Sequence, residues 1–203
     1  MVTGDNTGGA RFSTRDLVYI AILGAAWGLV ETSLGTYLHA LRIPFRGALL
    51  TALGLLVALC GRALMPKRGT VVMIGAVTAA LRLLSAGAVL LSPLAAILIE
   101  SLLAELVLWP SARPGRAAFA LAGATGTLWT VVHPFVTQGL VAGSGLIVVY
   151  GWLIESTARA LPVLAGLAWL LVVCAIAIPL ALGVVAGLVA HDLGARLQER
   201  LAH

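Results

Sequence analysis

The chain has 203 residues, of which 61% are hydrophobic and only 10% are charged. Soluble domains carry about 25% charged residues, so this chain has too little polar surface to cover a water-soluble globule, and lipid is the expected solvent. The formal net charge of +5 does not indicate nucleic-acid binding. The basic residues stand in short runs between apolar segments and form no basic helix or aromatic-studded basic strand.

The segment 1–16 is polar and is expected to form a flexible cytoplasmic tail. A helix that crosses a bilayer needs about 20 predominantly apolar residues. Six segments meet this requirement, and the expected spans are Leu17–Leu38, Gly47–Leu64, Thr70–Leu91, Pro93–Trp109, Ala117–Val136 and Pro162–Ala190. The predicted fold class is therefore an all-α integral membrane protein, a six-transmembrane-helix bundle over residues 17–191, followed by a cytoplasmic C-terminal tail at 192–203.

Local signals refine these spans. Ser92 and Pro93 alone separate the third span from the fourth, which predicts a tight turn with a proline suited to a helix start. Pro179 predicts a kink or tilt in the last span. The segment 137–161 is polar and interrupted by glycines, so residues 144–158 are expected to form a re-entrant segment or a short surface helix, with a seventh span as the less favoured alternative.

The distribution of lysine and arginine predicts the orientation. With the N-terminus inside, the outer segments hold only Arg42, Arg46 and Arg159. The cytoplasmic segments hold Arg11, Arg15, Arg62, Lys67, Arg68, Arg113, Arg116, Arg196 and Arg200. This bias places both termini in the cytoplasm of a multi-pass protein of the cell (inner) membrane.

Four ionisable residues lie within the expected spans: Glu31, Arg82, Glu100 and Glu105. A charge near the bilayer centre costs about 2.5–3.5 kcal/mol and usually faces the bundle interior. At a rise of 1.5 Å per residue, all four lie about 10–18 Å below the outer end of their spans. Arg82 is expected to pair with one of the glutamates of the fourth span. Glu100 and Glu105 are about 140° apart around their helix and are not expected to face the same spot.

Further polar and aromatic side chains gather toward the outer mouth, which predicts an outward-facing pocket for a small molecule. The predicted substrate-binding residues are Glu31, Arg82, Glu100, His133, His39, Arg46, Trp129 and Gln138. Purely structural roles for these residues also stay open: a structural ion pair for Arg82, an interfacial cap for His133, and solvated loop positions for His39 and Arg46. Tyr37, Trp109 and Trp152 fit an aromatic belt.

The first span carries small residues on one helix face, because residues three and four apart are neighbours. The stripe comprises Ala21, Gly24, Ala25, Gly28, Thr32 and Gly35. In lipid such a stripe allows another helix to approach closely. It therefore serves either packing within the chain or docking of a separate membrane protein.

The six-span size, the AxxxA pattern from Ala21 to Ala25 and the long segment before the last span resemble the S components of energy-coupling factor (ECF) transporters. This resemblance implies a small membrane protein that binds a vitamin or related micronutrient in the outer half of the bundle. It also implies that Ala21 and Ala25, with Gly24 and Gly28 on the same stripe, contact a transmembrane T component linked to two ATPase subunits. Three classes of substrate remain open: a thiamine-like cationic ring, a carboxylated or phosphorylated vitamin, and cobalamin.

No Walker A, HExxH or GxSxG motif occurs in the sequence, so neither an ATPase nor another enzyme is expected, and no cofactor or metal is assigned. Cys60 and Cys174 lie in apolar segments and fit buried small hydrophobes. Two other functions stay open: a stand-alone proton-coupled transporter that uses Glu31 or Glu100, and a non-transporting membrane scaffold or assembly protein.

Overall fold

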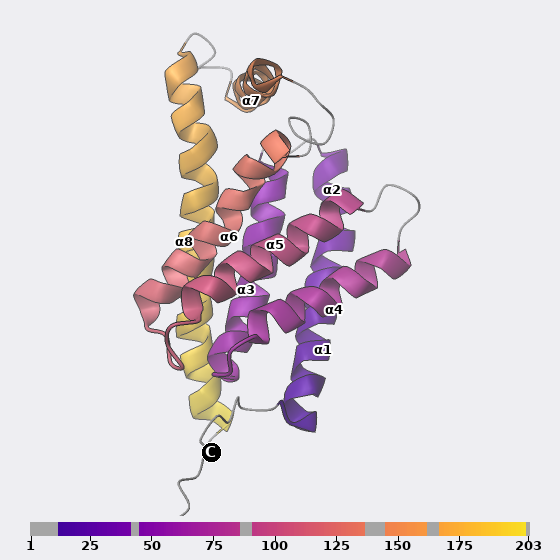
Figure 1. Cartoon of the computed structure of the whole chain (residues 1–203), viewed down its shortest axis with the longest axis vertical. Coiled ribbons are helices and arrows are strands. Elements are labelled where there is room, and N and C mark those ends of the chain that lie inside the picture. The colour runs from indigo at the N-terminus through magenta and orange to yellow at the C-terminus, as the bar shows by residue number, and fades with distance from the viewer. Residues whose placement is uncertain (1–11, 42–44, 86–90, 137–144, 162–166, 202–203) are drawn as a thin grey trace, which may run out of the picture.

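The computed structural model describes residues 12–41, 45–85, 91–136, 145–161 and 167–201 (Figure 1). Every regular element within these ranges is a helix, which confirms the all-helical prediction. The elements are α1 Thr14–Leu29, η1 Val30–Leu34, α2 Gly35–Ala40, α3 Arg46–Leu64, α4 Thr70–Ser85, α5 Leu91–Leu108, α6 Arg116–Pro134, α7 Leu146–Ala160 and α8 Ala168–Leu201.

The helices α1, η1 and α2 follow one another without a break and cover the first predicted span. A capping box fixes the start, because the Ser13 hydroxyl accepts from the Asp16 backbone N–H and the Asp16 carboxylate accepts from the Ser13 N–H. Asp16 also forms an ion pair with Lys67 at 2.5 Å, which ties the first turn of α1 to the α3–α4 connection.

Within the described ranges, three helical segments are long and apolar enough to cross a membrane: Thr14–Leu38, Arg46–Leu64 and Trp169–Arg200. A shorter apolar helix covers Thr70–Leu84. These segments agree with a membrane protein, as the composition predicts. The number of passes and the side of the membrane on which each terminus lies belong to the proposals below.

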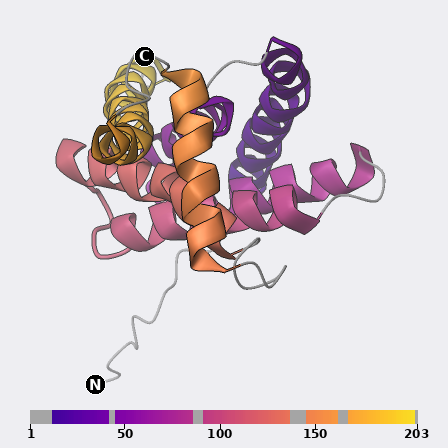
Figure 2. The same cartoon turned by 90° about the horizontal axis from the view of Figure 1, so that it is seen from above.

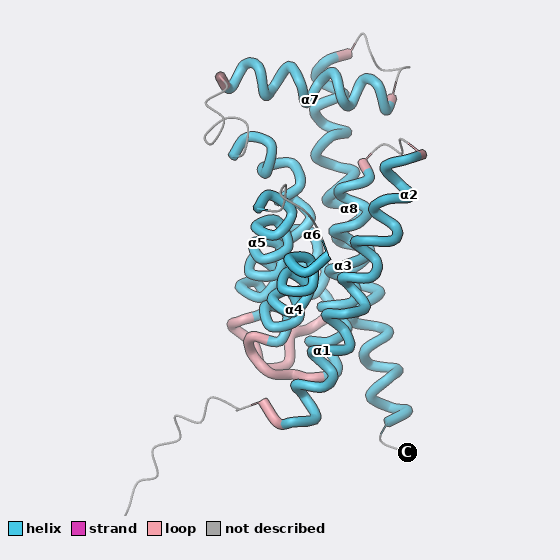
Figure 3. The backbone as a smooth tube through the Cα atoms, turned by 90° about the vertical axis from the view of Figure 1, so that its right-hand side faces the viewer, coloured by secondary structure: helices cyan, strands magenta, loops and turns pink. Residues whose placement is uncertain are grey.

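The long helices α1, α3 and α8 run along the long axis of the molecule, while α4 and α5 cross them obliquely (Figures 1 and 2). Helix α6 packs on both α5 and α8, α3 packs on α8, and α4 packs on α1. Helix α7 lies across one end of the bundle (Figure 3), hereafter the α7 end. At the opposite end, hereafter the C-terminal end, α8 ends and α1 begins.

Two predicted boundaries differ from the structure. Ser92 and Pro93 lie in the first turn of α5 and do not form a turn between helices, and α4 ends at Ser85. The last helix continues to Leu201, through most of the residues expected to form a tail. Contacts hold this extension, since Gln198 donates to the Ala63 carbonyl at 2.7 Å and Asp192 pairs with Arg116 at 2.8 Å. The segment expected to be re-entrant or a short surface helix forms the helix α7 over Leu146–Ala160.

Candidate functional site

A cavity of about 210 Å³ opens at the α7 end, between η1, α3, α5 and α6. Four of the predicted site residues line it: Glu31, Glu100, Trp129 and His133. These residues come from three helices that are far apart in the sequence. The complete lining consists of Glu31, Gly47, Leu50, Thr51, Pro93, Ala96, Ile97, Glu100, Trp129, Thr130 and His133.

Glu31 lies in η1, a single wide turn of π-helix that interrupts the first helical run. Such π-helical bulges are rare in proteins, and those that do occur are often found at functional sites. Hydroxyl groups around the bulge donate to backbone carbonyls one turn earlier: Thr32 to Gly28 at 2.9 Å, and Thr36 to Thr32 at 2.8 Å. These bonds satisfy carbonyls whose regular helical pattern the bulge disturbs. The bulge changes the helical register just where the carboxylate of Glu31 meets the cavity.

Glu100 is only 4% exposed and accepts a hydrogen bond from the Thr51 hydroxyl of α3 at 3.0 Å. Thr51 also lines the cavity and is absent from the predicted site. A signal was available, because Thr51 is the only hydroxyl side chain within α3. A lone hydroxyl in an apolar helix at the depth of a neighbouring carboxylate is a candidate partner for it.

Among the described residues, the indole nitrogen of Trp129 and Nε of Arg82 are buried without a hydrogen-bond partner. Trp129 lines the cavity itself, and its ring meets His133 edge to face at 5.8 Å between centroids. Trp27 and Arg82 do not line the cavity, but both interact with Glu31, Trp27 through its indole and Arg82 through electrostatic attraction. Buried donors without partners are uncommon in folded proteins and point to a missing acceptor.

The expected ion pair between Arg82 and a glutamate of α5 is not formed among the described residues. Arg82 interacts with Glu31 of the first helix, because α4 packs against α1 as well as α5. The structure does not place the other three predicted site residues in the cavity. Arg46 is exposed and does not line the cavity, the side chain of His39 is not among those described, and Gln138 lies outside the described residues.

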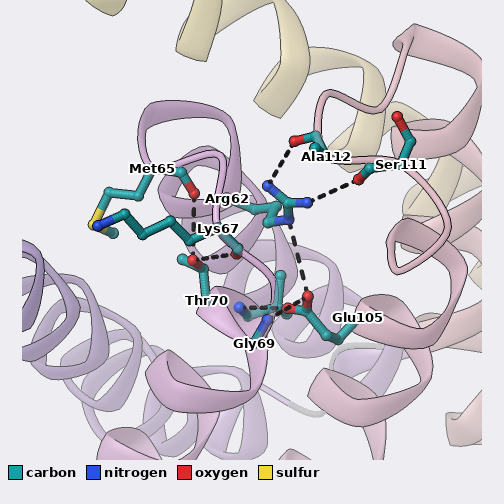
Figure 4. Close-up of polar contacts among 9 residues, drawn as sticks. Arg62, Met65, Lys67, Gly69, Thr70, Glu105, Ser111 and Ala112 are labelled. Atoms are coloured by element: carbon teal, nitrogen blue, oxygen red, sulfur yellow. Dashed lines mark hydrogen bonds and ion pairs between the residues drawn. The ribbon is translucent and has the colours of Figure 1, made fainter. Parts of the chain in front are cut away.

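Glu105 lies at the C-terminal end, where it accepts from the backbone N–H groups of Gly69 at 2.7 Å and Val71 at 2.8 Å. The carboxylate thus caps the start of α4 from a neighbouring helix. Arg62 pairs with it at 3.9 Å, with both side chains buried. Arg62 also donates to the carbonyls of Ser111 at 3.1 Å and Ala112 at 3.4 Å (Figure 4).

Sequence reasoning interpreted Arg62 only as a topology signal and missed this cluster. A signal existed in its position, since Arg62 stands in the last turn of an apolar helix and not in the loop after it. Arginine there can reach carbonyl groups at the ends of neighbouring helices. The pairing agrees with the expectation that Glu100 and Glu105 do not face the same spot.

The small-residue stripe of the first helix divides between two faces. Gly24 and Gly28 are buried against α4, where a Cβ on Gly24 would lie 2.6 Å from Val77 and one on Gly28 would lie 3.7 Å from Leu81. Ala21 and Ala25 are exposed. The glycines therefore serve packing within the chain, and only the alanines belong to an open surface.

A comparison with models of known protein families found no match, and neither the curated proteins nor the solved structures contained a significant match.

Proposed function

We propose that this protein binds a small polar solute in the α7-end cavity and delivers it across the cell membrane as the substrate-binding subunit of an ECF-type importer. One observation carries the proposal. Carboxylates from two helices, the ring of His133 and the unpaired buried indole N–H of Trp129 converge on one cavity. Ionisable residues within apolar helices are costly, and they are kept mainly where they serve a function.

The lining favours a solute with mixed chemistry. Glu31 and Glu100 suit an amine or another cationic group, because a carboxylate accepts charge-assisted hydrogen bonds. The indole N–H of Trp129 suits an acceptor atom on the same solute. The cavity of about 210 Å³ is smaller than the roughly 300–1,000 Å³ typical of sites for drug-sized ligands. These properties favour a compact vitamin or vitamin precursor.

The proposed orientation follows the basic residues. Among described lysines and arginines, Arg15, Arg62, Lys67, Arg68, Arg113, Arg116, Arg196 and Arg200 belong to the C-terminal end. Arg46 and Arg159 belong to the α7 end, and Arg82 lies within α4 beside Glu31. By the positive-inside rule, the cavity faces outward and the C-terminal end faces the cytoplasm, with six passes of the chain.

Docking to a T component is proposed for the open part of the first helix. Ala21 and Ala25 are exposed and are accompanied by the exposed side chains of Leu17, Val18 and Ile22. Two alanines one turn apart let a partner helix approach closely in lipid. Gly24 and Gly28 take no part in this surface, because α4 covers them.

The decisive experiment identifies the small molecules that co-purify with the protein, by mass spectrometry of gently purified wild type and variants. Glu31→Gln keeps the shape of the side chain and removes the carboxylate charge, and we expect it to reduce retention of a cationic solute by at least roughly tenfold. Glu155→Gln is the matched control, because Glu155 is exposed on α7 and does not line the cavity. The midpoint of thermal unfolding in detergent checks that both variants fold.

Equal retention by the two variants, or no retained solute in wild type after supplementation of the growth medium, contradicts the proposal. The transport mode is tested separately. Uptake that depends on co-expressed T component and ATPases supports the ECF mode. Uptake into proteoliposomes by the purified protein alone, abolished by a protonophore, favours the stand-alone proton-coupled transporter.

A further inference from the structure

A second and larger cavity, of about 320 Å³, lies at the C-terminal end between α3, the α5–α6 connection, α6 and α8. It is remote from the cavity described above, since α3 and α6 contribute opposite ends to the two. Its lining consists of Arg62, Ala63, Pro66, Arg113, Pro114, Phe119, His191, Ala195 and Gln198. Three of these side chains are basic or can become cationic, and none is acidic.

Two carboxylates contact side chains of this lining. Asp192 contacts Nδ1 of His191 at 3.2 Å and also pairs with Arg116 at 2.8 Å. Glu105 pairs with Arg62 at 3.9 Å and accepts two backbone N–H groups at the start of α4. Arg113 is exposed and has no hydrogen bond, ion pair or ring contact among the described residues. Arg113 is therefore the one basic side chain of this lining that has no carboxylate partner among the described residues, and it leaves the cavity with an unpaired positive charge.

Two of its side chains are held in place before any ligand arrives. Arg62 is 0% exposed, and its two terminal nitrogens each donate one hydrogen bond to a loop carbonyl. A guanidinium has five N–H donors in a rigid fork, so each terminal nitrogen of Arg62 keeps one further N–H, while Nε pairs with Glu105 at 3.9 Å. The ring of Phe119 meets that of His191 edge to face at 5.3 Å between centroids, which orients the imidazole.

We propose that this cavity binds the phosphate group of an anionic ligand. Arginine is the preferred side chain for phosphate, because its planar fork matches the oxygen atoms. In a membrane, the expected source is the head group of an anionic phospholipid. Basic pockets between the cytoplasmic ends of membrane helices bind such head groups, and the apolar lining from Pro66, Pro114 and Ala195 suits the glycerol portion. The lipid source, but not the phosphate chemistry, rests on the membrane location and orientation proposed above.

The test measures the affinity of the purified full-length protein for phosphatidylglycerol in detergent micelles, with phosphatidylcholine and inorganic phosphate as separate arms. Arg113→Gln removes a lining charge and is expected to weaken phosphatidylglycerol binding by roughly tenfold. Arg196→Gln is the matched control, because Arg196 is an exposed arginine at the same end of the molecule that does not line the cavity. It is expected to weaken binding by no more than roughly twofold, because Arg196 lies outside the cavity and its charge reaches a bound ligand only through screening solvent.

Ala195→Phe fills the cavity without changing the charge and should weaken binding as Arg113→Gln does. Ala117→Phe, at an exposed position outside the lining, should not. Binding of phosphatidylglycerol alone identifies a lipid site, and binding of inorganic phosphate alone identifies a soluble ligand. The proposal is overturned if Arg113→Gln and Arg196→Gln weaken binding equally. It is also overturned if Ala195→Phe leaves the binding of both phosphatidylglycerol and inorganic phosphate intact. Solute retention at the α7-end cavity is measured on the same variants and should not change, so the two proposals fail independently.

Discussion

Glu100 and Glu105 stand five residues apart on α5 and serve opposite ends of the bundle. Glu100 lines the α7-end cavity with Thr51 as its hydrogen-bond donor. Glu105 completes a buried cluster with Arg62 and with the first backbone N–H groups of α4. The angular separation of about 140° on a helix sends the two carboxylates to different neighbours. Identical side chains on one helix therefore have different roles.

For this single residue, we predict that the substitution Glu105→Ala strongly destabilises the protein. It removes the acceptor for two helix N-terminal donors and leaves Arg62 buried without its carboxylate. Breaking a buried ion pair in this way costs about 3–5 kcal/mol, which corresponds to a decrease of roughly 6–20 °C in the midpoint of thermal unfolding. Glu155→Ala is the control, since its pair with Arg159 is exposed. A decrease no larger than that of the control contradicts the structural role of Glu105.

Among the elements, α6 and α8 approach closely because glycines face each other along their contact. A Cβ on Gly123 would lie 2.0 Å from the carbonyl oxygen of Gly183, and one on Gly187 would lie 2.0 Å from that of Phe119. Gly183 and Gly187 are one turn apart on α8, the small-xxx-small spacing that brings membrane helices together. This contact fixes α6, and α6 carries Trp129 and His133 into the cavity.

Gly123→Ala should therefore lower stability, because the added methyl group meets backbone atoms that cannot move away independently. Overpacking of this kind costs about 1–3 kcal/mol, and thermal unfolding in detergent measures it. Gly151→Ala is the matched helical control. Apart from its own helix turn, no atom of the described residues lies within 4 Å of a Cβ at Gly151, and alanine favours a helix over glycine. Comparable losses for the two variants would show that the close contact is not responsible.

Across the whole molecule, the two ends differ in charge and in construction. The C-terminal end gathers most of the described basic residues, a buried ion-pair cluster and the larger cavity. The α7 end holds the cavity with the carboxylates and a helix laid across it (Figure 3). Helix α8 has 34 residues, about 51 Å at 1.5 Å per residue. This length exceeds a hydrocarbon core of about 30 Å, so α8 extends into a polar zone.

This asymmetry predicts opposite accessibility for the two ends in intact cells. In a variant lacking Cys60 and Cys174, a cysteine at Arg159 should react with a membrane-impermeant thiol reagent added outside. A cysteine at Arg196 should react only after the membrane is permeabilised. Both positions are exposed, so burial does not bias the comparison. The reverse pattern contradicts the proposed orientation.

The sequence by itself determined the helical class, the approximate helix positions and the residues worth testing as a site. Composition and apolar run length report directly on the solvent that a segment requires, and charged residues within such runs stand out without any structure. These signals are local, so they can be obtained from the amino-acid order. They are sufficient to select Glu31, Glu100, Trp129 and His133, the four predicted residues that line the α7-end cavity.

Only the tertiary structure decided which side chains meet. Arg82 interacts with Glu31 and forms no ion pair with an α5 glutamate among the described residues, Arg62 pairs with Glu105, and Thr51 donates to Glu100. The first helix likewise turns its glycines toward α4 and its alanines outward. Each of these outcomes depends on the rotation and tilt of one helix against another. Those variables are set by packing among all the helices together, and residue spacing within a single helix does not encode them.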